Sequence, residues 1–177
     1  GAGQGTDLVQ ASISYTLPDA VENLTLTGSG NLNGTGNSSD NVIIGNAGNN
    51  VIAGKGGVDT LTGNGGSDTF AFGTGDSAAT SGKHDLITDY TVGTDHIALT
   101  GIDADTSTSG IVDAFRFLDT APFDGQAGAL RYDATGAVTV LQGDVNGDKV
   151  ADFAIDLSGN KTLTSSDFTA GSLQIPL

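Results

Sequence analysis

Four consecutive nine-residue units decide the fold of this chain: GNSSDNVII (36–44), GNAGNNVIA (45–53), GKGGVDTLT (54–62) and GNGGSDTFA (63–71). The first position is Gly in every unit, and the sixth is Asn or Asp. The eighth position is always a large apolar residue, namely Ile43, Ile52, Leu61 and Phe70. Self-similarity at a fixed period indicates a repeat architecture, in which stacked units bury a core that no single unit can bury alone.

The composition of one unit predicts its local structure. The last three positions favour an extended strand with one apolar side chain pointing inward. The first six form a turn, where Gly permits positive φ and close backbone approach. Because turns alternate between two sides, turns eighteen residues apart lie against each other. A cation between them would meet carbonyl and Asp oxygens, which suit Ca²⁺ better than the strictly octahedral Mg²⁺.

These units resemble the RTX calcium-binding repeat, G-G-x-G-x-D-x-U-x. The resemblance implies a parallel β-roll that binds several Ca²⁺ ions. Where Asn replaces Asp, the charge is lost and ions should be weaker or missing; a calcium-free Gly/Asn solenoid is the alternative. The implied ligands are Asn41, Gly45, Ala47, Asn50, Gly54, Gly56, Asp59, Gly63, Gly65 and Asp68.

The segment before the repeats extends the same pattern. GQGTDLVQ (3–10) is similar to one further unit, with Asp7 in the ligand position. In ASISYTLPDAVENLTLTG (11–28), apolar residues alternate on both sides of Pro18-Asp19. Alternation of this kind indicates strands, so we expect a long hairpin-like coil of the same roll.

The period ends at Ala71, and residues 70–99 resemble the segment that follows the repeats in serralysin-type metalloproteases. The shared features are Phe70-x-Phe72, then Asp76-Ser77, then DLITDY (85–90) and GTDHI (93–97). The resemblance implies that Asp76 and Asp85 complete the last calcium sites. Asp59 should then pair with the Asp76 turn, and Asp68 with the Asp85 region, whereas Asp89 and Asp95 should act as turn-stabilising acceptors.

Residues 115–157 resemble the C-terminal cap of serralysin-type proteins. A cap is physically required, because an unprotected solenoid end exposes its core and an unpaired strand edge. We therefore expect an all-β fold, with a parallel β-roll in residues 1–75 and an antiparallel, β-sandwich-like cap in residues 76–177. The export signal of such proteins, Asp followed by apolar residues, is similar to Asp167-Phe168 in LTSSDFTAGSLQIPL (163–177).

A second type of calcium loop is suggested by GDVNGDKVADF (143–153). Oxygen ligands fall at loop positions 1, 3, 5, 7 and 9, as in the first part of an EF-hand loop. Position 12 is Ile155 instead of Glu, and Lys149 stands where Gly is usual. A tight hairpin whose Asp side chains bind backbone N–H groups explains the pattern equally well. The ligands would be Asp144, Asn146, Asp148, Val150 and Asp152.

The composition favours multivalent cations as partners. The 177 residues carry 6 basic and 21 acidic side chains, a net charge of −15, and 20 of the acids are Asp, which prefers turns. Nucleic acid is disfavoured because phosphate binding needs clustered Lys and Arg. No apolar run is long enough to span a membrane, and Cys is absent. With 37% hydrophobic residues, we expect a chain that is ordered once cations neutralise its Asp turns.

No catalytic motif stands out. The sequence lacks H-E-x-x-H and G-x-S-x-G, and its two histidines, His84 and His96, are twelve residues apart. We therefore expect a module without catalytic activity. The resemblance to RTX and serralysin-type proteins implies that it binds calcium and that a bacterial type I secretion machinery secretes it to the extracellular medium. Its further expected partner is an upstream catalytic or adhesive domain of the same polypeptide. The alternatives are the tail of a protease, lipase or glycan-active enzyme, and a polysaccharide-binding or adhesin module.

Overall fold

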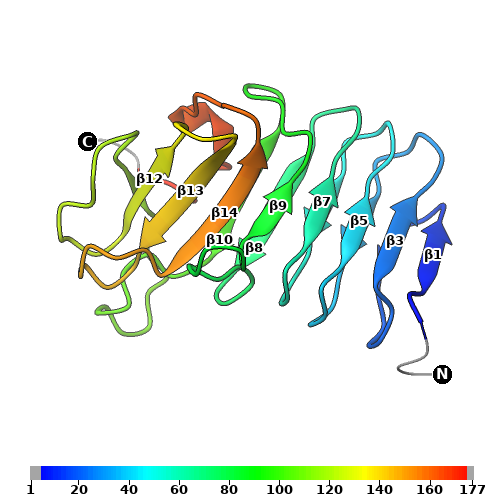
Figure 1. The fold of residues 1–177 in the computed structure, drawn as a ribbon, viewed down its shortest axis with the longest axis horizontal. Coiled ribbons are helices and arrows are strands. Elements are labelled where there is room, and N and C mark those ends of the chain that lie inside the picture. Colours follow the sequence, from blue (N-terminus) through cyan, green and yellow to red (C-terminus); the bar gives the residue numbers. More distant parts are fainter. Residues whose placement is uncertain (1–4, 175–177) are drawn as a thin grey trace.

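The computed structural model describes residues 5–174, which form two β-sheets (Figure 1). The nine-stranded sheet has the order β1 (Leu8–Ala11), β3 (Asn23–Leu26), β5 (Val42–Ile44), β7 (Thr60–Thr62), β9 (Asp85–Ile87), β14 (Phe153–Ser158), β13 (Val138–Asp144), β12 (Ala129–Asp133) and β11 (Arg116–Phe117). The five-stranded sheet has the order β10 (His96–Gly101), β8 (Thr69–Gly73), β6 (Val51–Ala53), β4 (Asn33–Thr35) and β2 (Tyr15–Thr16). A 3₁₀ turn, Ser165–Asp167, follows. No helix in this part of the chain is long and apolar enough to cross a membrane.

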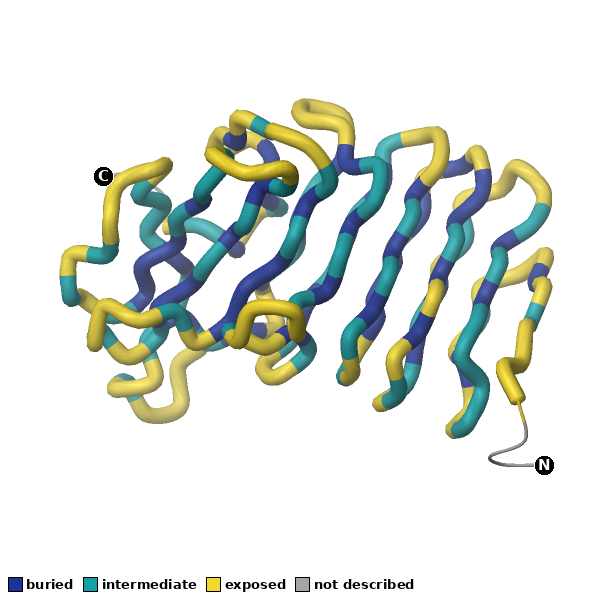
Figure 2. The backbone as a smooth tube through the Cα atoms, viewed as in Figure 1, coloured by how far each residue is buried: buried dark blue, intermediate teal, exposed yellow. Residues whose placement is uncertain are grey.

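The first ten strands form a parallel roll, because successive strands alternate between the two sheets. In one sheet, Leu24, Ile43, Leu61 and Ile87 lie in register across neighbouring strands. In the other, Ile52, Phe70 and Ile97 do the same. These side chains are completely buried, whereas the turns at both sides are largely exposed (Figure 2). The predicted inward positions of the repeat are thus confirmed.

The segment from Ala11 to Gly28 forms one coil of this roll. Strand β2 pairs with β4 in one sheet, and β3 pairs with β1 and β5 in the other. The two strands therefore do not form an antiparallel hairpin, although the turn at Pro18-Asp19 separates them as expected.

The roll and the cap share the nine-stranded sheet. Strand β9 pairs in parallel with β7 on one side and with β14 on the other. Strand β13 pairs antiparallel with both β12 and β14, so the expected antiparallel pairing is present in the cap, whereas β11 pairs with β12 in parallel. Parallel pairing continues past the expected boundary at residue 75, because β9 and β10 add one further coil. We keep the division into roll and cap as a proposal, with the roll extending to Gly101.

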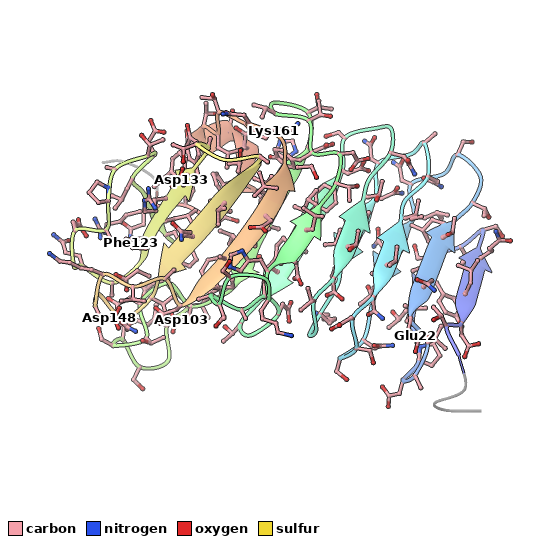
Figure 3. All side chains as sticks on the ribbon, viewed as in Figure 1. Glu22, Asp103, Phe123, Asp133, Asp148 and Lys161 are labelled. Carbon is pink, nitrogen blue, oxygen red and sulfur yellow. The ribbon has the colours of Figure 1, made fainter. Side chains whose placement is uncertain are left out.

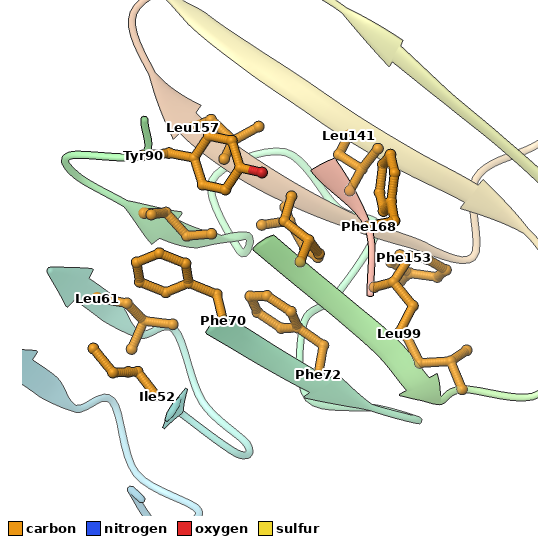
Figure 4. Close-up of a cluster of buried hydrophobic side chains, with 14 of the residues drawn as sticks. Ile52, Leu61, Phe70, Phe72, Tyr90, Leu99, Leu141, Phe153, Leu157 and Phe168 are labelled. Atoms are coloured by element: carbon orange, nitrogen blue, oxygen red, sulfur yellow. The ribbon is translucent and has the colours of Figure 1, made fainter. Parts of the chain in front are cut away.

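A continuous apolar cluster joins the two parts (Figure 4). Phe70 and Tyr90 lie at the end of the roll with ring centroids 6.2 Å apart, and Phe115 and Phe153 meet edge to face in the cap at 5.6 Å. Each fully buried side chain of this kind stabilises the fold by about 1.5–3 kcal/mol. Since the cluster contains side chains from both parts, the cap protects the apolar end of the roll.

Candidate metal centre

The register of the strands stacks the sixth positions of the repeat into two columns, one at each side of the roll. The first column lies beside the nine-stranded sheet, and its members come from successive coils: Asp7, Glu22, Asn41, Asp59 and Asp85. The second column lies beside the five-stranded sheet and contains Asn50, Asp68 and Asp95. Figure 3 labels Glu22, which marks the N-terminal part of the first column.

Backbone hydrogen bonds connect the members of each column. In the first, the Asn41 N–H donates to Asp59 Oδ1 and the Asp59 N–H donates to Asp85 Oδ1, both at 2.8 Å. In the second, Asn50 donates to Asp68 Oδ1 at 2.7 Å, and Asp68 donates to Asp95 Oδ1 at 3.0 Å. One oxygen of each receiving carboxylate is therefore satisfied by the coil before it.

The second oxygen of three carboxylates has no partner. Oδ2 of Asp59, Asp68 and Asp85 is buried and accepts no hydrogen bond, and each of these residues is at most 1% exposed. Desolvation by burial raises the pKa of Asp59 and Asp68 to about 6 and that of Asp85 to about 7. A buried charge without a partner is costly, so each group requires either a proton or a cation.

Glycine at the first repeat position makes room for these carboxylates. A Cβ on Gly54 would lie 2.0 Å from Asp59 Oδ2, and one on Gly63 would lie 2.3 Å from Asp68 Oδ2. Both distances are far below any tolerable contact. The repeat therefore needs Gly here because the carboxylate occupies the space of a side chain.

The orphaned oxygens fit a hard cation such as Ca²⁺, which binds carboxylate and carbonyl oxygens. Among residues 5–174, no group of three or more carboxylate, imidazole or thiol side chains could hold a metal by itself. A cation at these turns would therefore need main-chain carbonyls as well, such as those predicted at Gly54, Gly56, Gly63 and Gly65. Those carbonyl ligands stay a prediction.

The expected pairing of the last turns is wrong in one respect. Asp68 lies in the column of Asp95, and the charges of Asp95 and Asp89 act on it, whereas Asp85 belongs to the other column, beside Asp59. Asp76 acts electrostatically on Asp59, but its Oδ2 accepts the N–H of Gly73. The pairs are 26 and 27 residues apart instead of eighteen, because an inserted loop follows β8.

Asp89 and Asp95 act as acceptors, as predicted. Asp89 accepts the N–H groups of Gly63 and Asn64 at 2.9 and 2.7 Å, and Asp95 Oδ2 accepts that of Thr91 at 2.8 Å. Sequence reasoning missed that Asp95 is also the column neighbour of Asp68. The GTDHI motif, whose Ile97 continues the buried column of Ile52 and Phe70, contained that information.

The Asn-bearing turns differ from the Asp turns. Asn41 Oδ1 accepts the Asn37 N–H at 2.8 Å, and Asn50 Oδ1 accepts the Asn46 N–H at 2.9 Å. The carbonyl of Gly45, a predicted ligand, accepts the Asn64 amide at 2.7 Å, and Ala47 is exposed. Neither Asn side chain has an oxygen without a partner.

The loop from Asp144 to Asp152 lies at the cap end of the molecule, where Figure 3 labels Asp148. Asp144 is completely buried, and its two oxygens accept the N–H groups of Gly147 at 2.6 Å and Lys149 at 2.9 Å. Asp152 Oδ2 accepts the Val145 N–H at 2.7 Å. These contacts are those of the tight hairpin that the sequence left open, and calcium in this loop stays a prediction.

Polar contacts connect the roll to the cap, and His84 and Tyr90 take part in two of them. His84 Nδ1 lies 2.7 Å from Asp156 Oδ1 in β14. The Tyr90 hydroxyl donates to the main-chain oxygen of Asp95 at 2.9 Å and lies 3.3 Å from Asp167 Oδ1. Asp167 and Phe168, the expected export element, are at most 6% exposed, whereas residues 175–177 lie outside the described part of the chain.

Comparisons with known proteins give a consistent result. The sequence pattern of the family described as peptidase M10, serralysin C terminal, matches residues 17–170. The endo-1,3-1,4-beta-glycanase ExsH of Rhizobium meliloti (strain 1021) is 52% identical over 42 residues. These are 24% of this chain and 9% of the glycanase, so the chain spans a small part of that relative's length.

Two solved structures share the fold. Both are subunits of the mannuronan C5-epimerase of Azotobacter vinelandii, and both are about one fifth identical in sequence. The R2 subunit has a TM-score of 0.58 at 19% identity, with 99% of this chain and 98% of that chain covered. The R3 subunit has a TM-score of 0.50 at 20% identity, with 96% and 82% covered.

Proposed function

This chain belongs to the serralysin C-terminal family of the M10 peptidases, and on that premise we propose that it is a calcium-binding module of a secreted bacterial protein. Its RTX-type β-roll is the part that binds the ions. The cap closes the roll and packs against its last coil. The module itself carries no catalytic role, and its ions are structural.

The observation that carries this proposal is the set of three buried Oδ2 atoms without partners, on Asp59, Asp68 and Asp85. A bound Ca²⁺ neutralises the negative charge of these buried carboxylates. Asp59 and Asp85 belong to one ion-binding side of the roll, and Asp68 belongs to the other with Asp95. The like charges of Asp40 and Asp76 raise the pKa of Asp59 further, so a divalent ion relieves repulsion as well as desolvation.

We infer that calcium couples folding to export. In the low calcium of the cytosol, the Asp turns would be unneutralised and the chain suited to passage through a type I secretion machinery. In the extracellular medium, Ca²⁺ would order the turns. Family membership supports this sequence of events. The burial of Asp167 and Phe168 is compatible with it, since an export element is accessible before folding and covered afterwards.

A glycan-active parent protein is the second proposal. The curated relative is named as a glycanase, and the two solved neighbours are named as parts of an epimerase. Polysaccharide binding by the module itself has less support, because Arg116 is paired with Asp124 at 3.0 Å and the Arg131 Nε donates to the Ala121 carbonyl at 2.9 Å. A glycan array with and without Ca²⁺ tests that binding directly.

The calcium proposal is tested by circular dichroism and isothermal titration calorimetry on the full chain. In chelator we expect a reduced β signal, and added Ca²⁺ should restore it with saturable binding of several ions. Mg²⁺ at equal concentration is the control and should be much less effective, because it demands stricter octahedral geometry. A β signal and a thermal midpoint that are unchanged by Ca²⁺ would contradict the proposal.

A further inference from the structure

Two pairs of asparagines form a distinct device in the N-terminal coils. Asn37 and Asn41 lie in one turn, and Asn46 and Asn50 lie in the next, with the same spacing of four residues. Within each pair, the first side-chain oxygen accepts from the second amide, at 3.4 Å for Asn41 and 3.0 Å for Asn50. We call these two pairs the amide clamps.

The first clamp donates to the carbonyl groups of the preceding turn on its side of the roll. Asn37 Nδ2 donates to the carbonyls of Pro18 and Val21, both at 2.8 Å. Asn41 Nδ2 donates to the carbonyls of Val21 at 3.3 Å and Glu22 at 3.2 Å. Three carbonyl oxygens that point toward one place are therefore satisfied by two neutral amides.

The second clamp repeats this arrangement on the other side. Asn46 Nδ2 donates to the carbonyls of Thr27 at 3.4 Å and Gly30 at 3.0 Å, and Asn50 Nδ2 donates to that of Leu32 at 2.9 Å. The orientation of both column amides follows from their partners, since only a donor can face carbonyls and only an acceptor can face a backbone N–H.

An amide clamp and a cation are alternatives. A Ca²⁺ ion lies about 2.3–2.6 Å from each oxygen that it binds. Here the amide hydrogens already occupy the approach to those carbonyls. The side chains of Asn41 and Asn50 each accept a hydrogen bond at Oδ1 and donate at Nδ2, so neither has an unsatisfied polar atom. The turns at Asp59, Asp68 and Asp85 differ, because each retains a buried oxygen without a partner.

We propose that the amide clamps replace cations in the N-terminal coils, so that residues 15–53, which include the clamps and their carbonyl partners, fold without calcium and template the calcium-dependent coils of residues 54–101. Strands β5 and β6 of the clamped coils present the edges on which β7 and β8 pair. The inference rests on the proposed calcium function, which it restricts to one part of the roll. Calcium then orders coils onto an existing edge, without the cost of forming a first coil.

Hydrogen–deuterium exchange on the full chain tests this inference, with peptides read from residues 15–53 and 54–101 in chelator and in Ca²⁺. In chelator, the first set should exchange at least about tenfold more slowly than the second. Fast exchange of both sets in chelator, with slow exchange of both in Ca²⁺, would overturn the inference and leave the proposed function intact. Exchange that Ca²⁺ does not change in either set would overturn the proposed function and, with it, this inference.

Two variants make the test independent of overall stability. In Asn41→Asp/Asn50→Asp, each clamp loses a donor and gains a charge, so residues 15–53 should lose protection in chelator and recover it in Ca²⁺. In Asn37→Ala/Asn46→Ala, protection should fall and Ca²⁺ should not restore it, because no carboxylate has been added. Equal behaviour of the wild type and the Asp variant in chelator would overturn the role of the clamps.

Discussion

The turns around Asn50 and Asp68 occupy equivalent places in one column, but they differ at position six and in backbone, since only the Asp68 turn has positive φ at its second and fourth positions. Both follow a first-position glycine, Gly45 or Gly63, and they are neighbours in one column. Asn50 satisfies its oxygen and its amide within the protein, whereas Asp68 keeps a buried oxygen without a partner. The repeat therefore fixes the position of the sixth side chain, and the turn that carries a carboxylate there is the one that needs an ion.

The largest expected effect that separates the two kinds of turn is pH dependence in chelator. Burial raises the folded-state pKa of Asp59 and Asp68 to about 6 and that of Asp85 to about 7. A raised carboxyl pKa means that the folded state binds protons more tightly than the unfolded state. Stability is then greatest below the ordinary value of 3.8 and is lost as pH rises through about 6 to 7.

We therefore expect the thermal midpoint in chelator to fall by roughly 10 °C between pH 5 and pH 8, because residues 54–101 lose stability over this range. In saturating Ca²⁺ this fall should disappear, because the ion takes the place of the proton. Scanning calorimetry at both pH values measures the midpoint, and both values lie above the pI near 4.1. A midpoint in chelator that rises with pH would contradict the assignment of these carboxylates.

The second effect is the loss of one ion in Asp68→Asn. In Ca²⁺ at 100 times the dissociation constant, one lost ion lowers the free energy of unfolding by about 2.7 kcal/mol. In chelator the same change should stabilise the chain, because a buried charge is removed. Calorimetric titration should count one ion fewer.

Asn50→Ala is the matched control for that experiment. It should leave the ion count unchanged, because we assign no ion to the clamped turn, and it should destabilise the chain equally in chelator and in Ca²⁺. Equal loss of bound calcium in the two variants would show that both turns hold ions.

The third effect tests the room that glycine leaves for the carboxylate. In Gly54→Ala, the added Cβ would lie 2.0 Å from Asp59 Oδ2, so we expect a loss of about 1–3 kcal/mol. Gly56→Ala, in the same turn, places its Cβ 3.8 Å from Ser38 Cα and should change the free energy of unfolding by much less. Urea unfolding in Ca²⁺ measures both; similar losses would mean that the substitutions act through backbone freedom instead.

The smallest effect concerns the contact between roll and cap. Tyr90→Phe removes the hydroxyl that donates to the Asp95 carbonyl and contacts Asp167. We expect a cost of about 1 kcal/mol, the net value of a typical hydrogen bond, with faster amide exchange in residues 163–172 and unchanged calcium binding. A changed ion count in this variant would show that the cap contact reaches the calcium-binding turns.

Much of the roll could be predicted from local pattern. Ile43, Ile52, Leu61 and Phe70 are all completely buried, as their place in the repeat predicts. Asp59 and Asp68 stack in columns for the same reason, because a repeat with constant period repeats its contacts. Counting along the repeat does not predict the pairing of Asp68 with Asp95, because the loop after β8 changes the spacing from eighteen to 27 residues.

The satisfaction of individual polar atoms depends on contacts between coils. The pattern predicts that ions should be weaker or missing where Asn replaces Asp. It does not predict the orientation of the Asn side-chain amides. Position two of the repeat does not reveal the role of Asn37 and Asn46, because Asn also occupies it in an Asp-bearing unit, as Asn64. Their partners are carbonyls 16 and 19 residues away, in a coil without the repeat.

The sequence by itself determined the β-roll, its inward apolar columns, its position-six turn residues and the need for a cap, because each follows from a period of nine and from composition. The tertiary structure decided which oxygens remain without partners, which turns the amides close, and how β9 joins the roll to the cap through β14. The physical reason is that strand periodicity is local, whereas hydrogen-bond satisfaction and burial of charge depend on groups brought together from different coils.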